Sequence, residues 1–127
     1  MSFIIHEPEQ YVGRVIANGH CVRFLQEAGR LPHTSQWRRG ARVKNLSLAR
    51  GTCIATFDAD GLYANDTAGA SHAAVFLDQV SDGLVVYDCW VDQPVAQRTI
   101  RFKGGRDKPV NDGDQYHVIE VAAPERF

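Results

Sequence analysis

The sequence predicts an α+β domain in which N-terminal helices pack on a mostly antiparallel β-sheet. Two observations support this class. Apolar residues recur at helical spacing in the first third of the chain, whereas consecutive segments beyond residue 51 show the alternation typical of β-strands. The chain has 127 residues, which suffice for one hydrophobic core but not for two independent ones. We therefore expect residues 1–127 to form a single domain.

A short amphipathic helix is predicted at about residues 19–28. From Cys21 onward, apolar residues follow at i+3, i+4 and i+7, which defines one inward-facing stripe. Asn18 is a suitable N-cap, and Gly29 is a suitable C-terminal stop. The prediction places the Cys21 thiol on the packed face, near the positive end of the helix dipole.

The rest of the chain is predicted to form strands separated by polar turns. A short helical turn comes first, capped by Thr34 and closed by Gly40. Residues 104–115, rich in Gly, Asp, Lys and Asn, are expected to form a solvated loop. Strands are expected at residues 52–57, 72–77, 84–91, 97–102 and 116–121.

The composition is that of an ordinary globular protein, with 44% hydrophobic and 23% charged residues. A net charge of −1 provides no basic excess for binding nucleic acid, and no apolar run approaches the roughly 18 residues of a membrane span. The N-terminus lacks the pattern of a secretory signal peptide, so we expect synthesis in the cytoplasm. Three cysteines, Cys21, Cys53 and Cys89, have no metal-type spacing and are odd in number, which favours reduced thiols over a disulfide framework.

Cys21 is a candidate nucleophile because of its predicted place in the helix. Unpaired backbone N–H groups and the helix dipole stabilise a thiolate there, which lowers the pKa from about 8.5 for a free cysteine. The alternative is a small buried hydrophobic residue that happens to begin a helix. For Cys53 and Cys89, packing in the core is the favoured interpretation. Cys21 can act as a nucleophile, unlike Cys53 and Cys89, only if a base elsewhere in the chain can accept its proton.

His72 is the candidate base, since an imidazole can accept the thiol proton and then pass it to a leaving amine. It begins a strand that continues with Ala73 and Ala74, small residues that let a helix approach closely. His117 lies within the last predicted strand, where a structural or exposed histidine is the stronger alternative to a catalytic one. The remaining histidines, His6, His20 and His33, are interpreted as surface residues.

Asp88 is the candidate group that orients the imidazole and stabilises its cation. It interrupts an apolar strand, and burying a carboxylate there is costly unless a donor such as His72 faces it. A two-residue hairpin turn at Asp82-Gly83 would leave Asp88 roughly 16 Å along the strand from His72. We therefore predict a three-residue connection at 79–81 with a bulge at Gly83, which places Asp88 directly opposite His72.

A series of short motifs between residues 11 and 121 resembles one bacterial family. The motifs are Tyr11-Val12-Gly13, Gly19-His20-Cys21-Val22, Thr34-Ser35-Gln36-Trp37-Arg38-Arg39-Gly40, Gly51-Thr52-Cys53-Ile54-Ala55-Thr56-Phe57, His72-Ala73-Ala74 and Asp88-Cys89-Trp90. They are similar to those of the CHAP/NlpC-type, papain-like cysteine amidases, and among these to the type VI secretion amidase effectors. In those enzymes the cysteine begins a helix, the histidine begins a strand, and an acidic or amide residue on the next strand orients it. The resemblance therefore implies catalytic roles for Cys21, His72 and Asp88.

The resemblance also implies a papain-like fold and a peptidoglycan peptide amidase that uses no cofactor and no metal. The implied target is an amide of a stem peptide or cross-link, with the D-Ala–diaminopimelate cross-link favoured over the γ-D-glutamyl–diaminopimelate bond. Delivery by a type VI secretion apparatus into a competitor's periplasm is implied as well. A cognate immunity protein is expected to plug the groove in the producing cell.

Two positions depart from the family pattern, because His20 and Cys89 stand where that pattern has glutamine. Two other classes of function stay open from the residues alone. One is a transition-metal site formed by Cys21, His72 and Asp88, which one equivalent of zinc would favour. The other is a catalytically silent module that binds cell wall, in which Cys21→Ala would change nothing.

Overall fold

The computed structural model describes residues 2–16, 21–64, 70–90 and 93–121 of the chain. Its strands form one sheet in the order β1-β6-β2-β3-β4-β5, and every neighbouring pair in it is antiparallel. The strands are β1 (Arg38–Arg42), β2 (Cys53–Thr56), β3 (Ala73–Val80), β4 (Gly83–Trp90), β5 (Gln93–Arg101) and β6 (Tyr116–Glu120). The predicted α+β class with an antiparallel sheet is confirmed.

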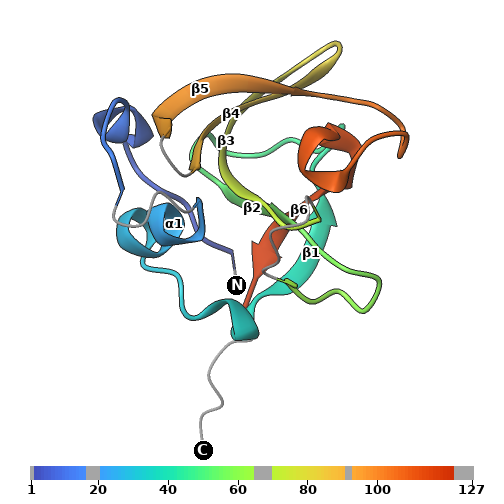
Figure 1. Cartoon of the computed structure of the whole chain (residues 1–127), viewed down its shortest axis with the longest axis horizontal. Coiled ribbons are helices and arrows are strands. Elements are labelled where there is room, and N and C mark those ends of the chain that lie inside the picture. The colour runs from blue at the N-terminus through green and yellow to red at the C-terminus, as the bar shows by residue number, and fades with distance from the viewer. Residues whose placement is uncertain (1, 17–20, 65–69, 91–92, 122–127) are drawn as a thin grey trace, which may run out of the picture.

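One α-helix lies in the part of the chain that the structure describes, α1 (Cys21–Gly29), so the expectation of several N-terminal helices is wrong. It packs against β3 and β4 through a face that buries Phe24 and Leu25 (Figure 1). The predicted N-cap, Asn18, lies outside the described residues. Short 3-10 turns accompany the helix: η1 (Pro8–Tyr11), η3 (Thr34–Gln36), η4 (Pro109–Asn111) and η5 (Gly113–Gln115). None of the described helices has the length and apolar character to span a membrane.

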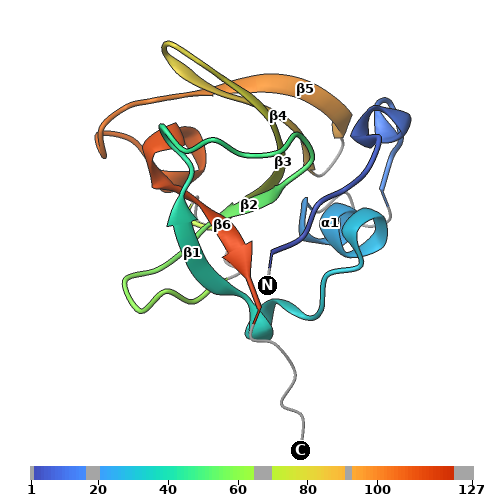
Figure 2. The same cartoon turned by 180° about the vertical axis from the view of Figure 1, so that it is seen from behind.

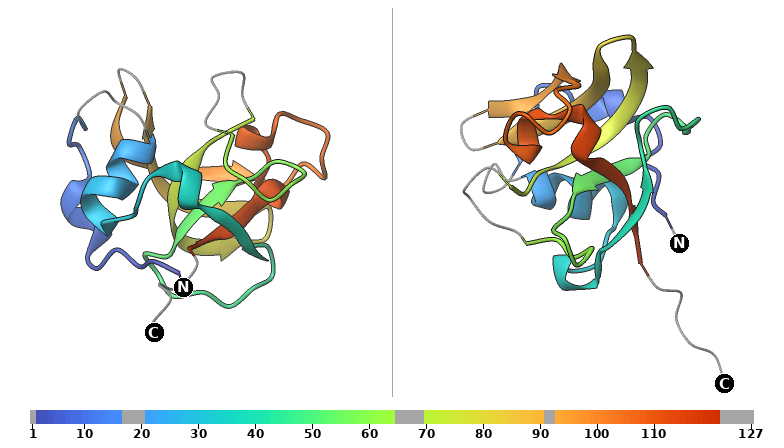
Figure 3. Two further views of the ribbon diagram at one scale, coloured as in Figure 1. Left: turned by 90° about the horizontal axis from the view of Figure 1, so that it is seen from below. Right: turned by 90° about the vertical axis from the view of Figure 1, so that its right-hand side faces the viewer.

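The sheet buries apolar side chains on both of its faces. Alternation along β3 sends Ala73 and Val75 toward α1, and sends Ala74 and Phe76 to the opposite side. Figure 2, seen from behind, and the left view of Figure 3 show α1 on one side of the sheet, away from the segment that carries η4 and η5. Because Ala73 has a small side chain, the helix can approach the start of β3 closely, as the sequence led us to expect.

Strand β1 is an element that the sequence reading missed. We expected a helical turn capped by Thr34 and closed by Gly40. Instead, His33 caps the 3-10 turn by accepting a hydrogen bond from the Ser35 backbone N–H at 3.1 Å, and Gly40 lies within β1. A Cβ at Gly40 would come 2.6 Å from the Val118 carbonyl oxygen on β6, so only glycine allows this approach. Strand β1 lies at the edge of the sheet and is mostly polar and exposed, which is why apolar alternation did not reveal it.

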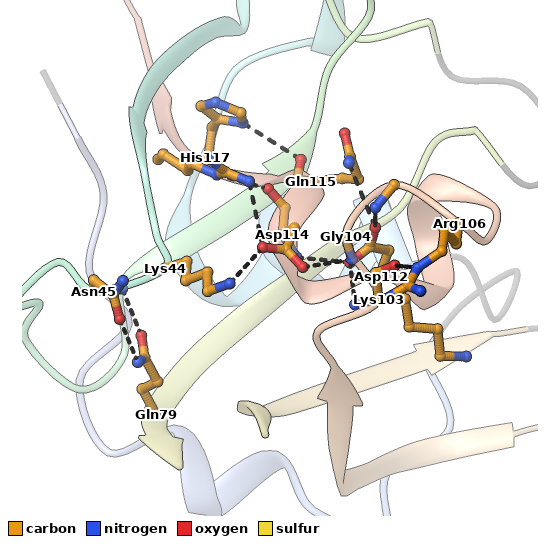
Figure 4. A network of polar contacts seen from close by, with 12 residues as sticks. Lys44, Asn45, Gln79, Lys103, Gly104, Arg106, Asp112, Asp114, Gln115 and His117 are labelled. Atoms are coloured by element: carbon orange, nitrogen blue, oxygen red, sulfur yellow. Dashed lines mark hydrogen bonds and ion pairs between the residues drawn. The ribbon is translucent and has the colours of Figure 1, made fainter. Parts of the chain in front are cut away.

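The segment after β5 is not simply a solvated loop, as the composition suggested. It folds around two buried carboxylates, shown in Figure 4. Asp112 accepts hydrogen bonds from the backbone N–H groups of Lys103 (2.8 Å), Gly105 (2.6 Å) and Asp114 (3.0 Å). Asp114 in turn accepts one from Lys44 Nζ at 2.8 Å. Polar composition predicts surface loops, but carboxylates with enough donors can be buried.

Candidate active site

The β3–β4 hairpin determines how its polar residues meet. Its strands are joined by the two residues 81–82, since Val80 pairs with Gly83. A bulge then shifts the register between Phe76 and Asp78. The predicted three-residue connection with a bulge at Gly83 is therefore wrong: the turn is shorter, and the bulge lies on the other strand.

His72 and Asp88 meet diagonally across this hairpin. Beyond the bulge, Val75 pairs with Tyr87, and the same register places Asp88 opposite Ala74. His72 is two residues before Ala74, just ahead of β3, and diagonal neighbours at this separation are within reach of long side chains. The predicted direct opposition is wrong, but the predicted contact is present. His72 Nε2 donates a hydrogen bond to Asp88 Oδ2 at 2.7 Å.

The backbone at His72 is held in place by β2. The His72 N–H donates to Thr56 Oγ1 at 3.0 Å, and the His72 carbonyl accepts from the Thr56 N–H at 3.0 Å. His72 and Asp88 are only 8% and 1% exposed. The imidazole thus has a fixed origin and a fixed partner, which limits the rotations available to its ring.

Cys21 is the first residue of α1 and approaches the same imidazole. Burial raises the pKa of this thiol, but the hydrogen bond and the charge of His72 lower it, as do the Ala73 backbone and the Tyr63 side chain. The balance lowers the pKa below that of an ordinary cysteine. Since Nε2 of His72 faces Asp88, Nδ1 is the nitrogen left for the sulfur.

The pKa of His72 moves in the opposite direction. Burial lowers it, but hydrogen bonds with Asp88 and Cys21, together with their charges, raise it to about 9. A thiol with a lowered pKa beside an imidazole with a raised one favours a thiolate–imidazolium pair near neutral pH. This pair is a nucleophile with its proton donor already in contact.

The other two cysteines lie in the core, as predicted. Cys53 and Cys89 are both buried, and burial raises the pKa of each thiol to about 12. For Cys89 the nearby charges of Cys21 and Asp88 act in the same direction. Both residues therefore stay protonated and inert at neutral pH.

The described histidines other than His72 have structural or surface positions. His33 caps η3, and His6 is exposed. His117 faces the ring of Phe57 at 6.4 Å, and burial is the main cause of its lowered pKa. His20 lies outside the described residues.

Two residues at this site escaped the sequence reading. Arg98 on β5 donates from Nε to Asp88 Oδ2 at 2.7 Å, although in the sequence it is one more charged residue of an alternating strand. Tyr63 packs 4.9 Å from the ring of Trp37 and interacts with Cys21. The only sequence signal that could have pointed to Arg98 is its place on the strand that follows the apolar strand interrupted by Asp88.

Metal binding finds little support in this donor set. Within the described ranges, no group of three or more His, Cys, Asp or Glu side chains is arranged to hold an ion. Asp88 Oδ2 already accepts two N–H donors, from His72 and Arg98. The arrangement fits hydrogen bonding and proton transfer better than ligation.

Comparison with known proteins identifies the family. A family model described as domesticated amidase effector 2 matches residues 1–119. A domesticated amidase effector 2 from Ixodes scapularis is 37% identical over 123 residues, covering 91% of this chain and 82% of the relative. A type VI secretion amidase effector 2 protein from Salmonella typhi is 33% identical over 119 residues, covering 83% and 88%. A solved structure of type 6 secretion amidase effector 2 superposes with a TM-score of 0.83 at 29% identity, covering 98% of both chains. The chain therefore belongs to the amidase effector 2 family, which includes type VI secretion and domesticated members.

Proposed function

We propose that this protein is a papain-like cysteine amidase that cleaves peptide bonds of peptidoglycan. The observation that carries the proposal is the single imidazole of His72, which contacts Asp88 through Nε2 and interacts with the Cys21 thiol. A nucleophile, a base and an orienting carboxylate in this order form the arrangement used for acyl transfer. Membership of an amidase effector family agrees with this chemistry.

In the proposed reaction, the Cys21 thiolate attacks the amide carbonyl carbon to form a tetrahedral intermediate. Backbone N–H groups at the start of α1, including that of Cys21, stabilise the oxyanion. The His72 imidazolium protonates the departing amine, which leaves a thioester on Cys21. Neutral His72 then deprotonates a water molecule, the hydroxide attacks the thioester carbonyl and releases the acyl group as an acid, and the thiolate–imidazolium pair is regenerated. Asp88 holds the ring throughout.

We place the substrate in the stem peptides or cross-links of a competitor's cell wall, because relatives are named type VI secretion effectors. Of the two bonds considered, we propose the D-Ala–diaminopimelate cross-link over the γ-D-glutamyl–diaminopimelate bond. This choice rests on the sequence resemblance alone. Export through the type VI apparatus, action in the recipient periplasm and a cognate immunity protein complete the proposal.

Digestion of purified cell wall with the wild-type protein and Cys21→Ala, followed by mass analysis of the fragments, tests it. The wild type should release peptides, and Cys21→Ala should release none. Cutting the cross-link converts dimeric muropeptides into monomers with complete stems, whereas cutting the γ-D-glutamyl bond shortens the stems. Cys53→Ala is the matched control, because it removes a buried thiol whose pKa, raised to about 12, lies far above the working pH, and it should leave cleavage in place.

Each alternative class predicts a different result. Intact muropeptides with the wild type, together with unchanged cell-wall binding by Cys21→Ala, would identify a silent binding module. Cleavage that stops on chelation and returns with zinc would identify a metal enzyme. Either result would overturn the proposed cysteine mechanism.

A further inference from the structure

Arg98 supplies a fourth charged group to the buried site. Its Nε donates to the same oxygen of Asp88 that accepts from His72, and both contacts measure 2.7 Å. The Asp88 side chain is 1% exposed and that of Arg98 is 29% exposed. The pair therefore extends from the interior toward the surface. The guanidinium also lies over the ring of Trp90, 5.5 Å from its centroid, which fixes its position from a second direction.

The position of Arg98 follows from the sheet register. Asp88 pairs with Ala96 on β5, and Arg98 is two residues further along the same face. His72 reaches Asp88 diagonally from β3, and Arg98 reaches it diagonally from β5. The carboxylate is thus held between neighbours on both adjacent strands.

Charge balance shows what this fourth group does. Burying a carboxylate is costly unless its charge is compensated. In the free enzyme the imidazolium of His72 is already matched by the thiolate of Cys21, so Asp88 needs another cation. When the thiolate becomes a thioester and His72 loses its proton, the Asp88–Arg98 pair remains balanced. The charges therefore alternate and cancel both before and after acylation.

We propose that Arg98 is a positioning residue of the amidase site, which compensates Asp88 so that the carboxylate can hold His72 while the proton moves. This inference rests on the proposed cysteine mechanism. Arg98 touches no reacting atom and acts through Asp88.

Removing the cation should make every nearby group bind its proton more tightly, because a positive charge disfavours protonation of its neighbours. The groups that titrate close to the working pH are Cys21 and His72. The charges of Cys21 and Asp88 also act on Cys89 in β4 and Tyr116 in β6, but burial is the main cause of their raised pKa values, about 12 for Cys89, and both stay neutral. The pH profile therefore reports on the pair formed by Cys21 and His72.

The test measures the pH dependence of Cys21 alkylation by iodoacetamide, followed on the Cys21 peptide by mass spectrometry, and of cell-wall cleavage. In Arg98→Gln, the inflections that report on Cys21 and on His72 should both move upward by about one pH unit, the size typical of losing one neighbouring charge. Arg98→Lys keeps the charge, so its inflections should stay close to those of the wild type. Arg101→Gln is the matched control, because it removes a guanidinium from the same strand that pairs with Asp82 in the hairpin turn.

Unmoved inflections in a folded Arg98→Gln protein would overturn the inference and leave Arg98 a packing residue. Should Arg98→Gln fail to fold, Arg98→Met removes the same charge while an apolar stem still covers Trp90, and the same criterion applies. Alkylation needs no cell wall. A wild-type protein that cleaves nothing therefore rejects the proposed function without deciding the role of Arg98.

Discussion

Two carboxylates, Asp88 and Asp112, are buried to almost the same degree but accept hydrogen bonds from different kinds of donor. Asp112 is fully buried and accepts hydrogen bonds mainly from backbone N–H groups, which neither move nor titrate. Asp88 accepts its hydrogen bonds from the side chains of His72 and Arg98. Asp112 thus stabilises the loop after β5, whereas Asp88 holds His72, the group that carries the proton.

The comparison extends to the neighbouring groups. Lys44 and the Gly104 backbone N–H outweigh burial and lower the pKa of Asp114 to about 2. Asp114 therefore stays charged at all working pH values, and its stabilising effect is lost only as pH falls below about 4 toward 2. The pKa of His72, in contrast, is raised to about 9, where a proton can be exchanged during reaction. The identity of the hydrogen-bond donor separates a structural carboxylate from a functional one.

The largest expected effect is on catalysis, in His72→Gln. Loss of the general acid and base should lower kcat/KM by about 10²–10⁴-fold. The melting temperature should change little. Thermal unfolding measured beside cell-wall cleavage checks both expectations. A variant that retains wild-type cleavage would remove the imidazole from the mechanism. His117→Gln, in β6 and away from Cys21, serves as the matched control.

Asp112→Asn should act on stability instead. An amide cannot match the acceptor capacity of the carboxylate, so one or more backbone donors lose their partner, at a cost of about 2–3 kcal/mol in the free energy of unfolding. Denaturant unfolding measures this value. The folded variant should cleave with wild-type kcat/KM. Asp107→Asn, an exposed loop carboxylate paired with Lys103, should change little. A large loss of activity in folded Asp112→Asn would contradict a purely structural role for Asp112.

Asp88→Asn should lower kcat/KM by about tenfold, the equivalent of about one lost charge interaction. Wild-type activity should rise with pH as Cys21 becomes a thiolate and fall through about 9 as His72 loses its proton. Without the Asp88 charge the imidazolium is less favoured, so the alkaline limb moves to lower pH. Asp82→Asn, in the exposed hairpin turn, provides the control profile. An unshifted alkaline limb would show that Asp88 does not support the His72 cation.

The smallest effect is expected in Tyr63→Phe. The hydroxyl helps to lower the pKa of Cys21, so its removal should raise the pH at which the thiolate forms and lower kcat/KM a few-fold at neutral pH. The ultraviolet absorbance of the thiolate measures this directly. Tyr87→Phe removes a hydroxyl that interacts with Arg50 and should leave the thiolate unchanged. Equal curves for Tyr63→Phe and the wild type would assign Tyr63 to packing alone.

Much of this organisation could be read from local patterns. The helix that begins near Cys21 and the five predicted strands are present, with boundaries displaced by a few residues. Cys21, His72 and Asp88 are brought together, while their catalytic roles stay a prediction. Strand β1 escaped because its exposed, charged residues carry no apolar alternation. Burial of the loop after β5 escaped because it depends on a side chain from another segment, Lys44, as well as on local backbone donors.

The sequence by itself determined the α+β class, the amphipathic helix with a thiol at its start, and the pairing of a histidine with an interrupted apolar strand. These features depend on periodicity and residue type, which neighbouring residues express locally. Only the tertiary structure decided that Asp88 meets His72 diagonally and shares its oxygen with Arg98. That outcome depends on a bulge in β3 and on packing across three strands, where a shift of one residue sends every side chain to the opposite face.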